Sequence, residues 1–227
     1  MIKAENIFDD IKPFVAMWVG DTNNDAGELA RVANIAIDEN ISFVSMPPDA
    51  TKTFWPWIEG KNIRILNRFN FSSEIKSDDF DACVSELSVG VRAAFRGGAN
   101  GAQIFVPHSE LEQFVQAMQP IRNDLFFDRH LSIGIDIDEM SGVDWETVFD
   151  TVAKIKPDSV LIFGHVQEFN PKSDFVGRIY DMLEKWSLNT ELHLMFGKNM
   201  LRVTQTLRLI QKMQPNLVKG LRVFVEK

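Results

Sequence analysis

Short apolar runs recur along the whole chain and are separated by longer amphipathic stretches. Each run is about as long as a β-strand and is apolar at nearly every position. That pattern is typical of parallel strands covered on both faces, because neither face then needs polar residues. It predicts eight strands, at residues 14–19, 41–46, 63–69, 102–106, 131–137, 159–163, 191–196 and 221–225.

The stretches between these runs carry apolar residues at helical spacing. They predict helices at residues 25–40, 78–96, 109–122, 144–154, 174–186 and 200–213, and one short helix at residues 50–58, interrupted by Pro56. Asp25 is placed to cap the first of these helices. Ser109 and Glu112 have the spacing of a capping box at the start of the third.

Strands that alternate with helices in this way predict a single (β/α)8 TIM barrel over residues 1–227. An open, doubly wound sheet is the alternative. No linker, repeat or low-complexity tract divides the chain. The sequence stops directly after the eighth predicted strand, so we expect no eighth outer helix. Residues 4–11 are a candidate for a helix that closes the barrel floor.

Charge and composition exclude several classes of binding partner for this protein. The net charge is −8 and no basic stripe offsets it, which argues against nucleic acid and anionic membrane surfaces as partners. No apolar run approaches the ~20 residues of a membrane span, and the N-terminal residues do not resemble a signal peptide. With one cysteine, Cys83, the chain forms no internal disulfide. We therefore expect a cytoplasmic protein.

Polar residues at the carboxyl ends of the predicted strands are the candidates for chemistry, because barrel active sites lie at that end. Asp136, His165 and Lys198 are the candidate catalytic residues: a carboxylate, an imidazole that titrates near neutrality, and an amine. Five further residues are candidates for substrate binding. These are Asn67, Arg68, Asn70, Gln103 and Asp138.

Two cations, Arg68 and Lys198, are the best placed for an anionic substrate. Each is equally able to form a structural ion pair with Asp136 or Asp138. A ligand held by these residues would be a small molecule at the carboxyl face of the barrel.

Asp136 and Asp138 alternate along a predicted strand, so both are expected on one side of it. If that side faces the barrel interior, the two carboxylates can act as a base or hold a divalent metal ion. Otherwise they are solvated carboxylates at the end of a strand. No zinc-type ligand spacing is present, and no cofactor is predicted. His130 and His193 are expected to be structural.

Four segments of the chain, in order, read like parts of one enzyme family. Residues 25–29 are Asp-Ala-Gly-Glu-Leu, residues 43–47 are Phe-Val-Ser-Met-Pro, and residues 65–71 are Ile-Leu-Asn-Arg-Phe-Asn-Phe. Residues 91–94 are Val-Arg-Ala-Ala, followed at 98–104 by Gly-Ala-Asn-Gly-Ala-Gln-Ile. Together they remotely resemble the deoxyribose-phosphate aldolases. The resemblance implies an aldolase-type barrel and lyase chemistry on a small carbonyl or phosphorylated metabolite.

The residues that carry that family's chemistry are not retained. The resemblance places the family's Schiff-base lysine at Leu161 and its fourth-strand aspartate at Gln103. Its first-strand aspartate falls at Trp18 or a neighbour, and its seventh-strand lysine at Met195 or Phe196. Schiff-base catalysis requires a lysine amine, so the family's own reaction is not expected here.

One functional hypothesis is an enzyme of altered chemistry, a lyase or isomerase that forms no Schiff base. It predicts a pocket at the carboxyl face, and a pocket plugged by Trp18, Phe105 and Met195 would argue against it. The site expected for it combines Asn67, Gln103, Asp136, His165 and Lys198.

The alternative is a barrel without catalysis, a pseudoenzyme that binds a ligand or acts in assembly. A homodimer would then cover any apolar seam left by the missing outer helix. A third hypothesis is an aldolase whose reactive amine has moved to Lys198.

Overall fold

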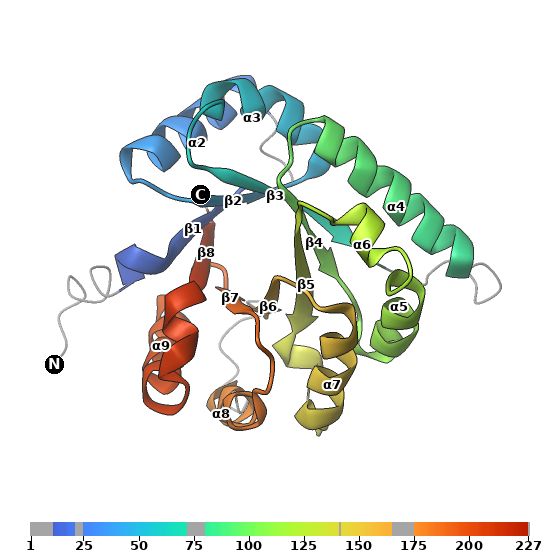
Figure 1. Ribbon diagram of the computed structural model, residues 1–227. Helices are drawn as coiled ribbons and strands as arrows, with labels where there is room; N and C mark the ends of the chain where they lie inside the picture. Colours follow the sequence, from blue (N-terminus) through green and yellow to red (C-terminus); the bar gives the residue numbers. More distant parts are fainter. Residues whose placement is uncertain (1–10, 21–24, 72–79, 141, 165–174, 227) are drawn as a thin grey trace, which may run out of the picture.

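Eight parallel strands form a closed barrel in sequence order, with β1 paired to β2 on one side and to β8 on the other (Figure 1). The structure, a computed structural model, describes residues 11–20, 25–71, 80–140, 142–164 and 175–226. The predicted (β/α)8 barrel is confirmed, since an open sheet would leave two edge strands unpaired. The strands are β1 (Val15–Trp18), β2 (Phe43–Met46), β3 (Arg64–Asn70), β4 (Gly101–Phe105), β5 (His130–Asp136), β6 (Ser159–Phe163), β7 (Glu191–Met195) and β8 (Arg222–Glu226).

Helices form a ring around the strands (Figure 1). The α-helices are α2 (Ala26–Asp38), α3 (Thr51–Ile58), α4 (Phe80–Arg96), α5 (Leu111–Met118), α6 (Arg122–Leu125), α7 (Trp145–Ile155), α8 (Phe175–Lys185) and α9 (Met200–Met213). Short 3-10 helices are η1 (Lys12–Phe14), η2 (Pro48–Ala50), η4 (His108–Glu110), η5 (Ile137–Glu139) and η6 (Pro215–Gly220). The helix expected at residues 4–11 lies outside the described residues except for Ile11.

Helix starts agree only partly with the sequence. Asp25 caps α2 as predicted, because its Oδ2 accepts hydrogen bonds from the backbone N–H groups of Gly27 and Glu28 at 3.1 and 3.2 Å. The capping box at Ser109 is wrong. Ser109 lies inside η4, and α5 begins after Glu110 without a side-chain cap, so Ser109 is not at a cap position.

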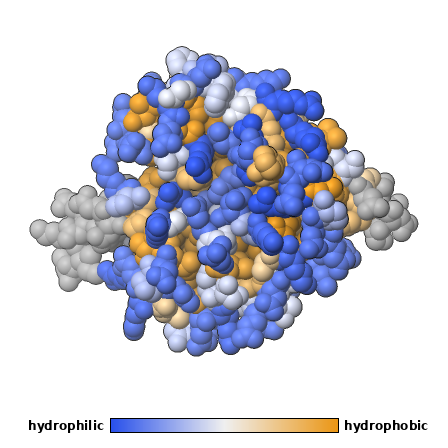
Figure 2. Space-filling model, viewed as in Figure 1, coloured by the Kyte–Doolittle hydropathy of each residue, from blue (hydrophilic) through white to orange (hydrophobic). Residues whose placement is uncertain are grey.

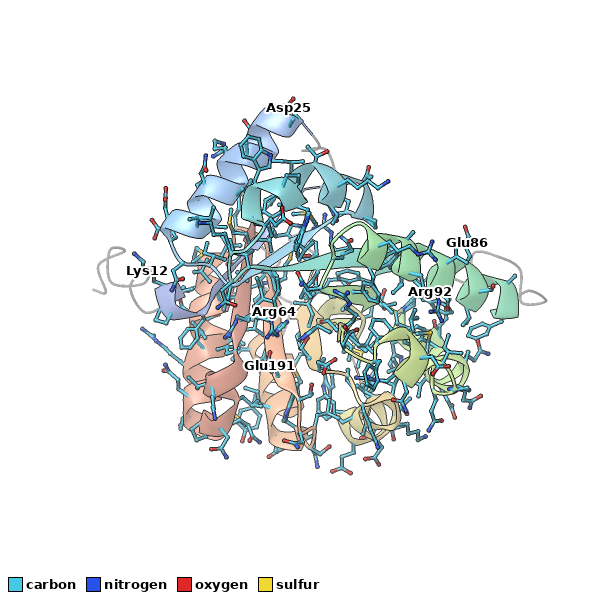
Figure 3. The ribbon with its side chains drawn as sticks, turned by 45° about the horizontal axis from the view of Figure 1, so that its top comes forward. Lys12, Asp25, Arg64, Glu86, Arg92 and Glu191 are labelled. Carbon is cyan, nitrogen blue, oxygen red and sulfur yellow. The ribbon has the colours of Figure 1, made fainter. Side chains whose placement is uncertain are left out.

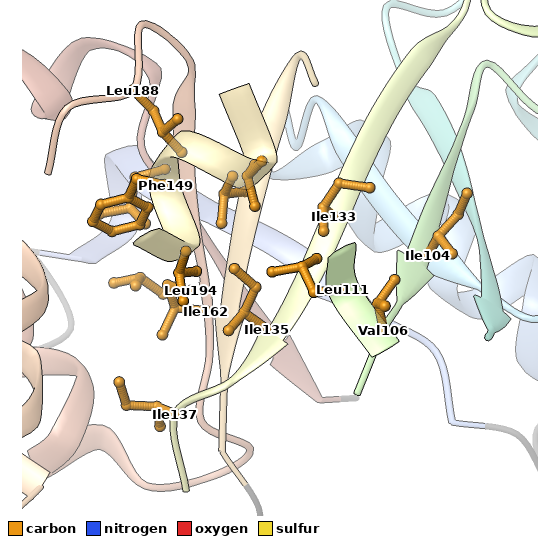
Figure 4. Packing of buried hydrophobic residues seen from close by; sticks show 14 of the residues in the cluster. Ile104, Val106, Leu111, Ile133, Ile135, Ile137, Phe149, Ile162, Leu188 and Leu194 are labelled. Atoms are coloured by element: carbon orange, nitrogen blue, oxygen red, sulfur yellow. The ribbon is translucent and has the colours of Figure 1, made fainter. Parts of the chain in front are cut away.

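Apolar side chains on the outer faces of the strands pack against the helices. Figure 4 shows this layer between β4–β7 and the helices outside them. Ile104, Ile133, Ile162 and Leu194 are all at most 1% exposed. Burial of each such side chain stabilises the fold by roughly 1.5–3 kcal/mol, which explains why strands with this outer face are so apolar.

Side chains that point inward fill the barrel in layers of four, supplied alternately by odd and even strands. Inward-pointing register partners on neighbouring strands fall in successive layers, because the strands are tilted. From the carboxyl end the layers are Pro47, Phe105, Phe163 and Glu226; then Trp18, Arg68, Gly134 and Met195; then Ser45, Gln103, Leu161 and Phe224; then Ala16, Leu66, Ser132 and His193; and then Phe43, Gly101, Ser159 and Arg222. Arg64, His130 and Glu191 lie below these, at the amino end.

On the face shown in Figure 2, hydrophilic residues predominate and hydrophobic ones form small, separate groups. The buried apolar residues make up the two layers of packing just described. Within the described ranges, no helix has the length and apolar character needed to span a membrane.

Candidate site at the carboxyl end of the barrel

A cavity of about 660 Å³ opens at the carboxyl end of the barrel. Its walls come from the ends of several strands, where barrel active sites lie, and its size is within the roughly 300–1,000 Å³ typical of small-molecule sites. The lining residues are Trp18, Pro47, Arg68, Asn70, Phe105, Phe163, Gly164, Met195, Gly197 and Glu226.

Trp18, Phe105 and Met195 line this cavity and do not plug it. All three are half-buried, and they pack on the apolar cluster that fills the barrel interior beneath the cavity. The Trp18 and Phe105 rings meet edge to face, with centroids 6.0 Å apart, and Phe105 meets Phe163 in the same way at 5.0 Å. These contacts hold the aromatic walls in a defined arrangement.

Arg68 supplies a guanidinium to the cavity, and its position is fixed by contacts on two sides. Its guanidinium carbon lies 4.1 Å from the centre of the Trp18 ring. Its Nη2 donates a hydrogen bond to the carbonyl oxygen of Val19 at 2.6 Å, and its Nη1 donates to Ser45 Oγ at 3.4 Å. A cation–π contact together with these hydrogen bonds orients the charged group in the wall.

Gln103, a predicted substrate-binding residue, lies one layer beneath the cavity. It is fully buried, and its Oε1 accepts a hydrogen bond from Ser45 Oγ at 2.6 Å. The Ser45 hydroxyl thus joins Gln103 to Arg68. The structure therefore places Gln103 behind the arginine and away from the lining of the cavity.

Gly134 makes room for this aromatic wall. A Cβ atom at Gly134 would lie 2.7 Å from Cδ1 of Phe105, which is closer than packed carbon atoms approach. Because Gly134 on β5 has no side chain, the Phe105 ring of β4 can pack over β5 at this position. Any larger residue there would displace the ring that forms part of the cavity wall.

Asn67, another predicted substrate-binding residue, points away from the barrel interior toward α3. Its side chain is fully buried, and its Nδ2 donates to Thr51 Oγ1 at 2.7 Å and to the Met46 carbonyl oxygen at 3.2 Å. Thr51 Oγ1 in turn lies 3.0 Å from Asn67 Oδ1. These bonds attach α3 to β3. In contrast, Arg68 and Asn70, the other two candidates on β3, both line the cavity.

Asp136 and Asp138 do not share one side of a strand, so that expectation is wrong. The strand ends at Asp136, whose buried Oδ1 accepts a hydrogen bond from the Asp138 backbone N–H at 2.8 Å. Asp138 lies in η5, where Oδ1 accepts from Nη2 of Arg178, on α8, at 3.2 Å. Among the described residues, no three side chains of His, Cys, Asp or Glu cluster closely enough to hold a metal ion.

The remaining candidates lie around the cavity or outside the described residues. Lys198 is exposed and follows Gly197, which lines the cavity, but Lys198 itself is not in the lining. His165 lies outside the described residues. Leu161, where the resemblance places the Schiff-base lysine, is fully buried one layer below the cavity floor.

Phe163 and Glu226 line the cavity but were not among the eight predicted site residues. Phe163 looks like one more apolar residue in an apolar strand, and Glu226 is next to the last residue of the chain. Strand alternation is the feature that could have identified them. It places Phe163 and Glu226 on the inward side of their strands, in the same layer as Phe105, once the strand registers are known.

A second group of titratable residues fills the amino end of the barrel. Figure 3 shows Arg64 and Glu191 together at the centre of the ring of helices. The rings of His130 and His193 lie parallel with centroids 5.8 Å apart, and His130 Nε2 lies 2.8 Å from Ser159 Oγ. Burial lowers the pKa of His130 to about 3 and also lowers the pKa of His193. Both histidines are therefore neutral near pH 7, and His193 lies in the core as expected.

No protein-family model matches the sequence, and neither does any curated protein. Solved structures do match. The tetrameric deoxyribose phosphate aldolase from Aeropyrum pernix has a TM-score of 0.68 at 10% identity, over 99% of this chain and 94% of its own. A protein assigned as a deoxyribose-phosphate aldolase in Toxoplasma gondii ME49 has a TM-score of 0.69 at 11% identity, over 98% and 91%.

A barrel of different activity is also similar. The phosphoenolpyruvate phosphomutase from Streptomyces platensis subsp. rosaceus has a TM-score of 0.57 at 12% identity, over 97% of this chain and 78% of its own. At such identities the likeness concerns the fold alone, because one barrel supports many reactions. The predicted likeness to the deoxyribose-phosphate aldolases is therefore confirmed for the fold: the chain is a TIM barrel with the same architecture as these structures.

Proposed function

We propose that the protein binds a small anionic molecule with an apolar body in the carboxyl-end cavity, and that Arg68 contacts its carboxylate or phosphate group. The observation that carries this proposal is the position of the guanidinium in the cavity wall, between the Trp18 ring and the Val19 carbonyl. A guanidinium presents N–H donors in one plane, which suits the paired oxygens of carboxylates and phosphates.

The other walls support an apolar body for this ligand. Trp18, Phe105, Phe163 and Met195 present aromatic and thioether surface to the cavity. Small-molecule sites typically combine such a surface with a few polar groups that fix orientation. Asn70 at the rim adds an amide that can donate to, or accept from, a polar substituent of the ligand.

A second candidate function is an acid–base reaction on the bound ligand, of lyase or isomerase type and without a Schiff base. Glu226 lines the same cavity as Arg68, so a substrate anchored by the arginine would have a carboxylate available to move a proton. Asp136, His165 and Lys198 remain predictions as catalytic residues.

The binding proposal is tested by thermal unfolding with benzoate, cyclohexanecarboxylate and phenyl phosphate, and with benzyl alcohol as a neutral match. We expect a bound anion to raise Tm by about 5 °C or more at 100 times its Kd. The Arg68→Met variant should lose this shift. Arg31→Met, in an exposed ion pair on α2, should keep it. An equal shift from benzyl alcohol, or a full shift in Arg68→Met, would contradict the proposal.

The catalytic candidate needs a separate measurement. Small keto acids are incubated in D₂O with the protein, and exchange of the hydrogens next to the carbonyl is followed by NMR. Catalysed exchange that falls at least tenfold in Glu226→Gln, and not in the exposed Glu59→Gln, would support it. Binding without catalysed exchange would favour the pseudoenzyme.

Assembly with a second copy of the chain and residence in the cytoplasm also stay predictions. Light scattering at micromolar concentration tests the first: a monomer there would remove the homodimer.

A further inference from the structure

Three polar atoms deep inside the barrel have no hydrogen-bond partner among the described residues. They are Nε2 of Gln103, Oγ of Ser132 and Nδ1 of His193. All three side chains are fully buried. An unsatisfied buried polar atom costs roughly 1–3 kcal/mol, and buried polar groups in native proteins are nearly always paired with protein or with an ordered water.

These three side chains lie next to one another in the barrel core. Gln103 and Ser132 are register partners on β4 and β5, so their backbones are neighbours. His193 shares an inward layer with Ser132, and Gln103 lies in the layer directly above. The Ser132 layer also contains Ala16, so two of its four side chains are small.

The donors and acceptors of these groups complement one another. Ser45 Oγ accepts from Arg68 and donates to Gln103 Oε1, which leaves the Gln103 amide nitrogen as a donor. His193 Nε2 lies 3.4 Å from the Glu191 carboxylate and therefore carries the proton. His193 Nδ1 is then an acceptor. Ser132 Oγ can serve in either role.

We infer that the barrel core holds one ordered water molecule, bound by Gln103 Nε2, Ser132 Oγ and His193 Nδ1. The water accepts from the glutamine and donates to the histidine, and three partners are the usual number for a buried water. It completes a chain of hydrogen bonds that runs from Arg68 in the cavity, through Ser45 and Gln103, to His193 and Glu191 at the amino end.

The chemistry of the three groups selects water over an ion. A cation would face the N–H donors of Gln103, and an anion would face the lone pair of His193 Nδ1. Nε of Arg222, a further donor without a partner in the described part of the chain, lies one layer closer to the amino end, where its guanidinium carbon is 5.3 Å from the Phe43 ring centre. Its positive charge adds to the cost of a cation in this core.

The direct test is a crystal structure of the ligand-free protein at a resolution that shows ordered waters. We expect density about 2.7–3.2 Å from each of the three atoms. Continuous packing of side chains through this position, without density for a water, would overturn the inference. The measurement does not depend on whether any anion binds in the cavity.

A pair of variants gives a second test through the sign of a stability change. Ser132→Ala would deprive the water of a partner, so we expect the unfolding constant to rise about fivefold, the equivalent of ~1 kcal/mol. Thr206→Val is the control, because Thr206 Oγ1 on α9 is equally buried and unpartnered within the described residues but lies outside the barrel. Removal of a lone buried hydroxyl should leave stability unchanged or increase it.

If Ser132→Ala behaves like Thr206→Val, the Ser132 hydroxyl binds no water and the inference fails. Far-UV circular dichroism of both variants checks that the barrel is folded before unfolding is measured. Chemical denaturation then provides the two unfolding constants under identical conditions.

Discussion

The guanidinium of Arg68 on β3 lies against the ring of Trp18 on β1, 4.1 Å from its centre, at the base of the carboxyl-end cavity. Arg68 is the one cationic side chain among the described residues that line the cavity, and Trp18 is the largest aromatic side chain there. A double-mutant cycle with Arg68→Met, Trp18→Leu and the double variant should give a coupling of roughly 0.5–2 kcal/mol in the free energy of unfolding. Additive effects within experimental error would show that the stack contributes nothing.

Gly134→Ala should disturb the cavity through Phe105. The new Cβ would lie 2.7 Å from Cδ1 of the ring, so the ring must move, and we expect a loss of roughly 1–3 kcal/mol in stability. Gly20→Ala is the matched control, since a Cβ there meets no atom within 4 Å. Urea denaturation of both variants checks this, and equal stabilities would refute the proposed role of Gly134.

The pair between Asp138 and Arg178 should stabilise the protein more than exposed pairs do. Their side chains are 30% and 17% exposed, and Arg178 also donates to the Asp138 carbonyl oxygen. Asp138→Asn should therefore cost about 1–2 kcal/mol. Glu28→Gln, which breaks the exposed pair with Arg31, should cost less than ~1 kcal/mol. The reverse order of the two losses would contradict a structural role for Asp138.

Stability should fall as the pH is lowered from about 6.5 toward 3. Burial lowers the pKa of His130 to about 3, so in this range the unfolded chain binds a proton that the folded chain does not. Burial also lowers the pKa of His193, which acts in the same direction. At pH values below the usual pKa of a glutamate, Glu191 also contributes to the loss of stability, because the hydrogen bond from His193 lowers its pKa in the folded protein.

His130→Gln isolates one part of this pH dependence. In this variant the unfolded chain no longer takes up the proton that His130 binds on unfolding. The slope of the free energy of unfolding against pH should therefore become shallower by up to about 1.4 kcal/mol per pH unit between pH 4 and 6. His108→Gln, a replacement of the same kind at an exposed position, is the control. Denaturation at several pH values measures both slopes, and an unchanged slope in His130→Gln would rule out the buried, neutral imidazole.

Leu161→Lys should not restore a Schiff-base enzyme, although the resemblance places the family's lysine there. Leu161 is fully buried beneath the cavity floor, so its ammonium would be desolvated, at a cost on the order of 3 kcal/mol or more. Treatment with a small aldehyde and borohydride, followed by mass spectrometry, should show no adduct at position 161. Phe163→Lys, in the cavity lining, should form one and serves as the control.

The sequence by itself determined the alternation of eight strands with helices and favoured a barrel over an open sheet. Eight apolar runs of strand length, separated by amphipathic stretches, are compatible with few folds, because both faces of each strand must be buried. The same pattern predicted a site at the carboxyl ends of the strands. Two of the residues that it selected there, Arg68 and Asn70, line the cavity. Asp25 was predicted correctly as a helix cap, because such a cap bonds only to backbone N–H groups two and three residues further along the chain.

Only the tertiary structure decided which way each polar side chain points. In a strand buried on both faces, no polar face marks the inward direction, so Asn67 and Arg68 look alike in sequence and yet point to opposite sides of β3. Closure of the barrel then places Arg68 of β3 and Glu226 of β8 in one cavity, although they are far apart in the chain. The site depends on strand stagger and barrel closure, which are properties of all eight strands together and of no single segment.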